Sequence, residues 1–193
     1  MTKYIAFLRG INVGNIRIKM TDLKTMFEGL GFQAVKTYLQ TGNVVFESPK
    51  AYGELKPMLE KALSDTFHYQ AYVLLYLFDD LADIIAQYPM ARDESHHAYV
   101  IFIDKPAVFE ELRDIAATLG EESANIMAGK NLLYWKVPIG QSTDTSFSKA
   151  SAKAKYKSSV TVRNLNTLEK MVWRGFWKQV SDTFESVRHL LSE

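Results

Sequence analysis

A cationic loop that contains two glycines follows the first predicted strand. The apolar run over residues 3–8 predicts a strand near the amino terminus, and the chain then turns polar. Glycines let such a loop curl its backbone N–H groups around an anion, and a guanidinium offers several hydrogen-bond donors to a carboxylate or phosphate. We therefore regard this loop as a candidate anion-binding site. Its candidate residues are Arg9, Gly10, Asn12, Gly14 and Arg17.

A second polar turn is expected to lie beside this loop. Strands predicted over residues 33–39 and 43–47 are joined by the short turn 40–42, Gln-Thr-Gly, which is typical of a hairpin. In a ferredoxin-like unit the first two strands run parallel, so the loop after the first and the hairpin after the second emerge at the same end of the sheet. An alternative interpretation is that the glycines only permit tight turns and the amides bond the loop backbone. The candidate residues here are Gln40, Thr41 and Asn43.

A basic segment in the last quarter of the chain suggests a different kind of function. Residues 140–178 contain eight Lys and Arg residues and only two acidic ones, whereas the net charge of the whole chain is +1. Lys149, Lys153 and Lys157 are four residues apart and would share one face of a helix predicted over residues 146–156. With the nearby aromatic residues, this face could bind single-stranded nucleic acid. The alternative is a solvated lysine face over buried aromatic residues.

No residue pattern identifies a catalytic group, a metal site or a cofactor. There is no phosphate-binding P-loop and no G-x-S-x-G nucleophile motif, and none of the four histidines lies at metal-ligand spacing from another. Catalytic residues are therefore unknown, and neither a metal nor a cofactor is expected. The chain has no cysteine, so disulfides and thiol chemistry are excluded. No apolar run approaches the ~20 residues of a membrane span, and we expect a cytoplasmic protein that does not enter a membrane.

The predicted elements follow the order strand, helix, strand, strand, helix, strand, and this order occurs twice. In the first half, the remaining elements are a helix over 21–30, a helix that ends near residue 66 and a strand over 69–78. In the second half, strands over 98–103, 123–127, 132–137 and 159–163 accompany helices that begin at Pro106 and Ser146. The sequence therefore predicts an α+β protein made of two ferredoxin-like βαββαβ repeats with antiparallel sheets and a C-terminal helical extension.

The proposed boundaries divide the chain into three parts. The first repeat and a connecting helix cover residues 1–89, the second repeat covers 96–164, and two helices make up 165–193. Asn166 is the predicted cap of the first of these helices. The apolar stripe that follows Gly175 would pack on a sheet or, failing that, form a dimer face. We accordingly expect a monomer or a weak homodimer.

Three segments are similar to the bacterial domain-of-unknown-function family 1697. They are FLRGINVG at residues 7–14, TYLQTGNVVF at 37–46 and TVRNLNT at 161–167. The family has no established activity, but the resemblance implies where a site would lie. The hallmark polar residues of the family match Arg9, Asn12, Gln40, Asn43, Arg163 and Asn164. Because these residues come from both repeats, the resemblance implies a site between the two halves.

These observations lead to three hypotheses of function. In the first, the protein binds a small anionic or phosphate-bearing ligand through the loop at Arg9, the hairpin at Gln40 and the pair Arg163 and Asn164. In the second, it is a nucleic-acid-binding module that uses the basic segment. In the third, it is a structural or interaction protein without a ligand. Whether any reaction is catalysed stays open.

Overall fold

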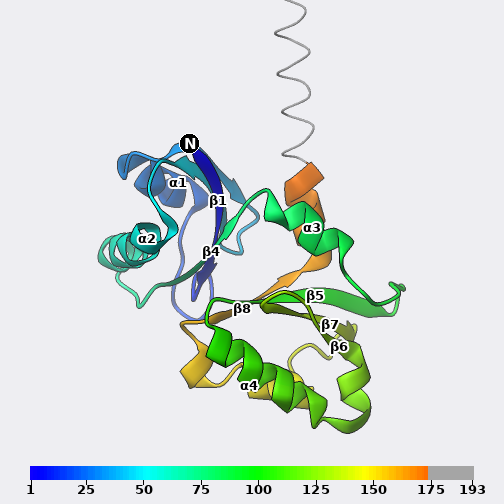
Figure 1. Cartoon of the computed structure of the whole chain (residues 1–193). Coiled ribbons are helices and arrows are strands. Elements are labelled where there is room, and N and C mark those ends of the chain that lie inside the picture. Colours follow the sequence, from blue (N-terminus) through cyan, green and yellow to red (C-terminus); the bar gives the residue numbers. More distant parts are fainter. Residues whose placement is uncertain (174–193) are drawn as a thin grey trace, which may run out of the picture.

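The computed structural model describes residues 1–173 and contains two four-stranded antiparallel sheets (Figure 1). The first half is built from β1 (Thr2–Arg9), α1 (Met20–Gly29), β2 (Gln33–Tyr38), β3 (Asn43–Ser48), α2 (Tyr52–Phe67) and β4 (Tyr72–Leu77). Its strands lie in the order β2-β3-β1-β4, and each neighbouring pair is antiparallel. This order and connectivity are those of the ferredoxin-like unit, which confirms the predicted fold class for the first sheet.

The second half repeats the same arrangement after a short helix, α3 (Asp80–Ala86). Its strands lie in the order β6-β7-β5-β8, again with antiparallel neighbours. Its elements are β5 (His96–Ile103), α4 (Pro106–Ala117), the 3₁₀ helix η1 (Gly120–Asn125), β6 (Ile126–Ala128), β7 (Leu132–Pro138), α5 (Ser146–Ser151), the 3₁₀ helix η2 (Ala154–Tyr156) and β8 (Val160–Asn164). A helical stretch over residues 165–173 follows β8.

Two elements of the second half are shorter than predicted. The predicted strand 123–127 is mostly η1, because the Glu122 carboxylate accepts hydrogen bonds from the N–H groups of Ser146 and Phe147 and holds this segment against α5. The predicted helix 146–156 ends at Ser151, where the hydroxyls of Ser148 and Ser151 bond carbonyls of the preceding turn. Serine hydroxyls that bond the backbone in this way compete with helix propagation.

Two predicted helix starts are also displaced by a residue or two. The first helix begins at Met20 rather than Thr21, and its N-cap residue is Lys19. The helical stretch that begins at residue 165 is capped by Asn164 rather than Asn166, because the Asn164 side-chain oxygen accepts a hydrogen bond from the Asn166 N–H at 2.9 Å. The apolar stripe predicted after Gly175 lies outside the part of the chain that the structure describes. Within residues 1–173, no helix is both long and apolar enough to cross a lipid bilayer.

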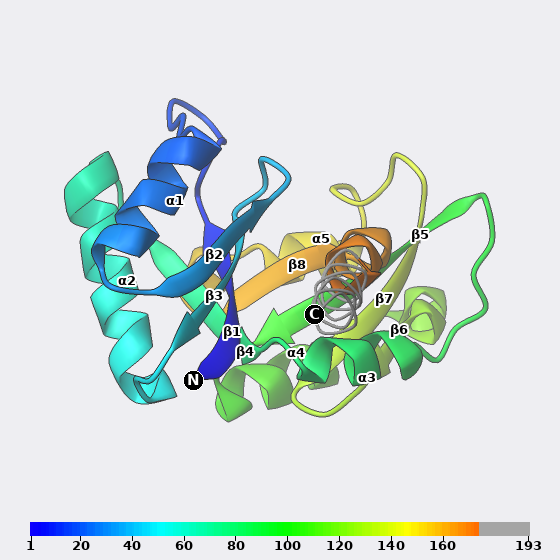
Figure 2. The same cartoon turned by 90° about the horizontal axis from the view of Figure 1, so that it is seen from above.

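Two helices cover the outer face of each sheet, and the two inner faces share a core with α3 and residues 165–173. α1 and α2 lie on the outer face of the first sheet, α4 and α5 lie on the outer face of the second, and α3 lies with residues 165–173 on the inner side (Figures 1 and 2). Side chains alternate between faces along a strand. In β1, therefore, Tyr4 and Ala6 pack under α1 and α2, whereas Ile5 and Phe7 join the core between the sheets. This shared core explains why β1 and β5 are apolar on both faces.

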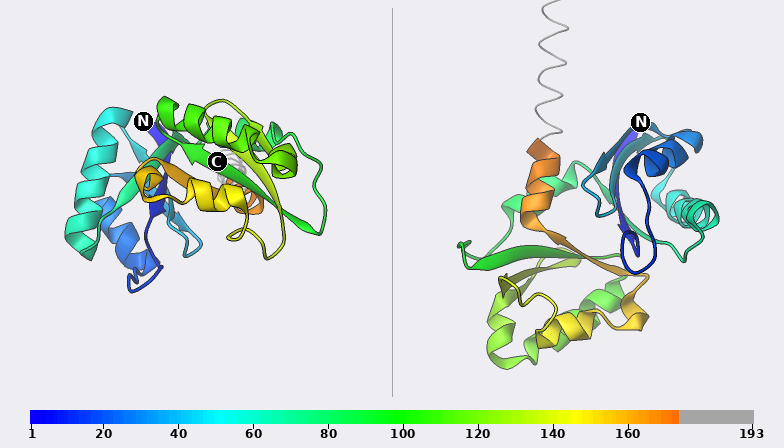
Figure 3. Two further views of the ribbon diagram at one scale, coloured as in Figure 1. Left: turned by 90° about the horizontal axis from the view of Figure 1, so that it is seen from below. Right: turned by 180° about the vertical axis from the view of Figure 1, so that it is seen from behind.

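The shared core fixes the two halves relative to each other. Phe7 of β1 and Phe102 of β5 pack with ring centroids 4.5 Å apart. The hydroxyl of Tyr76 donates to the Ile103 carbonyl at 2.9 Å and accepts from the Ile103 N–H at 3.0 Å. Lys56 of α2 also joins the two halves, through an ion pair of its ammonium with the carboxylate of Asp104, which follows β5, at 2.9 Å. Loops from the two halves can therefore build one site, because the end of β1 contacts β8 where Arg9 donates to the Val160 carbonyl; Figure 3 shows the two halves from below and from behind.

Candidate functional site

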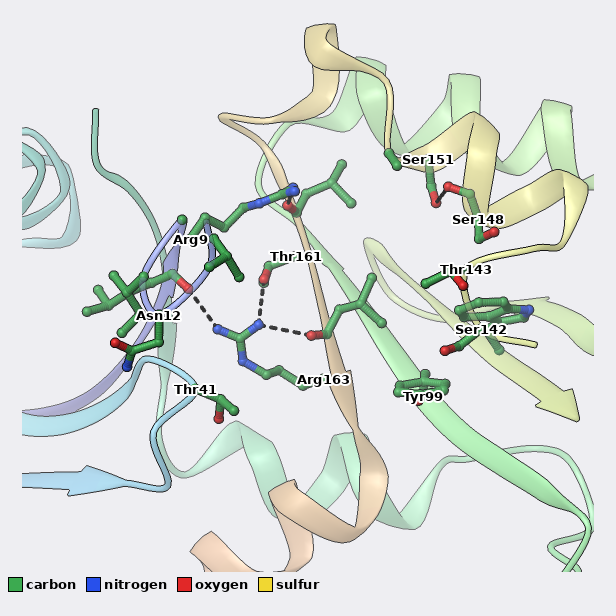
Figure 4. A pocket seen from close by; sticks show the side chains of 18 of the residues that line it. Arg9, Asn12, Thr41, Tyr99, Ser142, Thr143, Ser148, Ser151, Thr161 and Arg163 are labelled. Atoms are coloured by element: carbon green, nitrogen blue, oxygen red, sulfur yellow. Dashed lines mark hydrogen bonds between the residues drawn. The ribbon is translucent and has the colours of Figure 1, made fainter. Parts of the chain in front are cut away.

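A pocket of about 650 Å³ lies where the two halves meet (Figure 4). The first half contributes the end of β1, the loop that follows it and the β2–β3 hairpin. The second half contributes β5, β7, the loop before α5, α5 itself and β8. Its volume is within the ~300–1,000 Å³ range of small-molecule sites. We call it the inter-sheet pocket. Its polar and aromatic lining residues are Arg9, Asn12, Gln40, Thr41, Tyr99, Trp135, Ser142, Thr143, Ser148, Lys149, Ser151, Thr161 and Arg163.

The inter-sheet pocket contains most of the residues that the sequence suggested. The loop after β1 and the β2–β3 hairpin lie at the same end of the first sheet, because Arg9 is the last residue of β1 and Asn43 is the first of β3, which is antiparallel to it. The second half then closes the pocket from the other side. The predicted residues that line it are Arg9, Gly10, Asn12, Gln40, Thr41 and Arg163.

Four predicted residues do not line the pocket. Gly14 adopts the left-handed conformation, with φ of +56°, and serves the shape of the loop. Arg17 is bonded to the carbonyls of Gly14 and Ile16 within its own loop, both at 2.9 Å. Asn164 caps the following helical stretch. Asn43 is fully buried, and its side-chain oxygen accepts a hydrogen bond from Arg163, which does line the pocket.

The guanidinium of Arg163 connects the second half to two segments of the first. It donates from Nε to the side-chain oxygen of Asn43 at 2.6 Å and from Nη2 to the carbonyls of Leu8 at 3.0 Å and Gly42 at 3.5 Å. It also donates to the hydroxyl of Thr161 at 2.7 Å and to the carbonyl of Val162 at 2.9 Å (Figure 4). These acceptors are all neutral. Burial, and secondarily the charge of Arg9, lower the pKa of Arg163 to about 9, so the group remains protonated at neutral pH.

Arg9 and Lys149 are the other cations of the pocket. Arg9 is the last residue of β1, and its guanidinium donates to the Val160 carbonyl of β8 across the interface. Burial lowers the pKa of Arg9 from its usual value. Lys149 belongs to α5, on the opposite wall. Among the described residues that line the pocket there is no Asp or Glu, so the three positive charges have no carboxylate beside them there.

Asn12 and Gly42 hold the two turns of the first half together. The Asn12 amide donates to the Gln40 carbonyl at 2.9 Å, and its oxygen accepts from the Ile18 N–H at 2.9 Å. Asn12 therefore bonds backbone, as the alternative interpretation proposed for the amides. Gly42 has φ of +73°, and a Cβ there would lie 2.9 Å from Ile11 Cδ1. Glycine is needed at this position because the two turns touch.

The sequence analysis missed the wall that the second half supplies. Its hydroxyl-bearing residues are Ser142, Thr143, Ser148, Ser151 and Thr161. Its aromatic residues are Tyr99 and Trp135, whose ring centroids lie 5.4 Å apart. The density of Ser and Thr between residues 142 and 151 was an available signal. The two aromatic residues gave none, because aromatic side chains are common in buried strands.

The lysine residues proposed for nucleic acid do not share a helical face. α5 ends at Ser151, so Lys153 and Lys157 lie beyond it and flank η2. Lys149 is the member of this set that lines the inter-sheet pocket, and the Lys157 ammonium lies 5.8 Å from the ring centroid of Tyr72. The geometric basis of the nucleic-acid hypothesis is therefore wrong, although binding itself stays a prediction.

Comparison with known proteins places the chain in a family. A search of curated proteins gave no match. Among solved structures, the conserved bacterial protein SP0830 from Streptococcus pneumoniae is similar in fold, with a TM-score of 0.71 and 23% sequence identity over 88% of this chain and 96% of that one. The family model described as "Protein of unknown function (DUF1697)" matches residues 1–134, and these include Arg9, Asn12, Gln40 and Asn43 of the pocket region. The chain therefore belongs to the DUF1697 family.

Proposed function

We propose that the protein binds a small anionic ligand, such as a phosphate-bearing metabolite, in the inter-sheet pocket. The observation that carries the proposal is the charge of the lining: Arg9, Lys149 and Arg163 contribute three positive charges and the described lining contributes no negative one. Cations without a counter-charge in a partly closed pocket attract an anion more strongly than the same groups would in open solvent.

The three cations have different parts in this proposal. Arg163 uses its donors on neutral acceptors from the protein, so it supplies charge while holding the walls of the pocket in place. Arg9 makes one hydrogen bond, to the Val160 carbonyl, among the contacts of residues 1–173, and the rest of its guanidinium is available to a ligand. Arg9 and Lys149 are therefore the expected direct contacts, one from each half.

Binding, rather than a reaction, is the activity that these observations support. The hydroxyls of Ser148 and Ser151 donate to the backbone carbonyls of Thr145 and Ser148, and the described part of the lining contains no histidine or carboxylate that could act as their base. The hydroxyls of Ser142 and Thr143 can instead donate hydrogen bonds to a bound ligand.

The test is a thermal-shift and calorimetric titration of the purified protein with inorganic phosphate, sugar phosphates, nucleotides and small carboxylates. A ligand at 100 times its Kd adds ~2.7 kcal/mol of stability, or roughly 5–10 °C in Tm for a chain of this size. Arg9→Ala should abolish the shift. Arg17→Ala is the matched control, because it removes an arginine from the same loop but outside the pocket.

Two results would overturn the proposal. One is the absence of any shift with every anion of the panel. The other is a shift that is equally large in wild type, Arg9→Ala and Arg17→Ala, which would place the bound anion elsewhere. A short RNA is added as a further arm: a shift with RNA alone, retained in Arg9→Ala and lost as salt is raised, would favour the nucleic-acid hypothesis instead.

A further inference from the structure

The inter-sheet pocket has two chemically different sides. In Figure 4, Arg9 and Asn12 lie on one side, Tyr99, Ser142 and Thr143 lie on the other, and β8 runs between them. A bare phosphate would need only the cations, Arg9 on the first side and Lys149 on the opposite wall, and not the aromatic ring. A pocket of about 650 Å³ with a second, aromatic side fits a larger ligand that carries an anion at one end.

Tyr99 is held rigidly as part of the aromatic side. It pairs with Trp135 across β5 and β7, and the two rings are inclined by 31°. Trp135 is only 3% exposed and packs in turn on Phe147, at 5.9 Å between ring centroids. Tyr99 itself is half-buried and lines the pocket. An aromatic ring in a pocket wall is a surface on which a flat heteroaromatic ring can stack, as bases do on aromatic side chains.

The lining also indicates how many phosphates the ligand carries. Nucleoside di- and triphosphates are usually bound with Mg²⁺, which proteins hold through carboxylates. No carboxylate is present among the described lining residues, and residues 1–173 contain no group of three or more acidic or histidine side chains placed to hold a metal ion. Two or three cations without an acidic neighbour match the charge of about −1.5 to −2 on a single phosphomonoester.

The hydroxyl groups suit the part of the ligand between its phosphate and its ring. Ser142, Thr143 and Thr161 line the pocket, and a hydroxyl can both donate and accept. A sugar presents hydroxyls that need both kinds of partner, whereas a purely apolar linker would make no use of these protein hydroxyls.

We propose, on the basis of the proposed function, that the ligand is a phosphomonoester joined to a flat heteroaromatic ring through a sugar, that is, a nucleoside monophosphate. Its phosphate contacts Arg9 and Lys149, and its base stacks on Tyr99. Arg163 acts as a positioning residue behind the phosphate.

The test compares the Kd values of AMP, GMP, CMP and UMP with those of ribose 5-phosphate, pyridoxine 5′-phosphate and adenosine, by calorimetry on the full chain. Stacking of one base on an aromatic ring corresponds to about 5- to 150-fold in Kd. At least one nucleotide should therefore bind more tightly than ribose 5-phosphate by a factor in that range. Tyr99→Leu should remove this advantage and leave the Kd of ribose 5-phosphate unchanged, and Tyr99→Phe, which keeps the ring, should retain it.

The failure of this inference can be distinguished from the failure of the proposed function. If ribose 5-phosphate binds as tightly as every nucleotide and Tyr99→Leu changes nothing, the nucleotide is refuted and the anion site stands. If pyridoxine 5′-phosphate alone binds more tightly than ribose 5-phosphate, stacking of an aromatic ring on Tyr99 stands but the nucleotide is refuted. If adenosine binds as tightly as AMP, or Arg9→Ala binds all ligands normally, the proposed function itself fails.

Discussion

The replacement Arg163→Lys tests whether the guanidinium of Arg163 holds the two halves together. Lysine keeps the positive charge, but its ammonium has three N–H donors at one point, whereas Arg163 makes five hydrogen bonds to acceptors on several sides. At least two of the five bonds must therefore be lost. The bond to Asn43 is the most costly candidate, because Asn43 is 0% exposed and its oxygen would be left buried without a donor.

The expected loss of stability follows from these contacts. A hydrogen bond to a charged group contributes roughly 1.5–3 kcal/mol, so two lost bonds correspond to about 3–6 kcal/mol. The Gly42 carbonyl keeps a second donor, the Leu8 N–H at 2.7 Å, which reduces the cost. We therefore expect Arg163→Lys to lower the free energy of unfolding by about 2–4 kcal/mol and Tm by roughly 4–16 °C.

Urea and thermal unfolding, followed by circular dichroism, would measure the effect. The matched control is Arg113→Lys, since Arg113 is exposed and contacts only the acidic side chains of Glu110 and Asp114 among the described residues. Its replacement should change the unfolding free energy by no more than about 0.5 kcal/mol. If Arg163→Lys were as stable as Arg113→Lys, the charge of Arg163 and not its hydrogen-bonding geometry would hold the interface, and the reasoning above would be refuted.

Gly42, the charge of a bound phosphate and Asp93 can be tested separately. Gly42→Ala should destabilise the protein by about 2–3 kcal/mol in urea unfolding, because Gly42 has a positive φ and a Cβ there would contact Ile11. Gly14→Ala is the control: Gly14 also has a positive φ but has open space around it, so the loss should be about 1 kcal/mol. Equal losses in the two variants would contradict the close contact of the two turns. In calorimetry, a phosphomonoester should bind more tightly as the pH rises from 5 to 7. Its second ionisation, with a pKa near 6, produces the dianion over this range while the arginines stay protonated. A Kd that does not change with pH would speak against phosphate recognition. Hydrogen bonds from Lys136, and then from neighbouring groups, lower the pKa of Asp93, so its stabilising contribution is present above about pH 4 and lost as the pH falls. The urea stability of Asp93→Asn should therefore decrease less than that of wild type between pH 5 and 2, and parallel curves would disprove this.

The first half of the pocket could be predicted from the sequence because it depends on local signals and on element order. Arg9 ends an apolar strand and Gln40 precedes a glycine turn, and the βαββαβ order alone brings such segments to one end of a sheet. The position predicted for a site, between the halves, is also where the pocket lies, since Arg163 of β8 lines it and donates to the Leu8 carbonyl near the end of β1.

The rest depended on contacts that no local pattern reveals. Arg163 and Asn164 were proposed together, but Asn164 is the last residue of β8 and its side chain caps the helical stretch that begins at residue 165, so only Arg163 lines the pocket. Tyr99 and Trp135 look like ordinary core residues in their strands, and their role depends on how the second sheet meets the first. The early end of α5 depends on hydroxyl bonds of Ser148 and Ser151 that compete with a pattern otherwise typical of a longer helix.

The most direct test of the central claim, that an anion binds between the two halves, is to map its position by two-dimensional ¹H–¹⁵N NMR during titration with a phosphomonoester. We expect the largest changes in amide shift on both sides of the pocket, in the loop 10–13, the hairpin 40–41 and the strand segment 160–163. Changes confined to residues 153–157, or to one half of the molecule, or no changes at millimolar ligand, would contradict it.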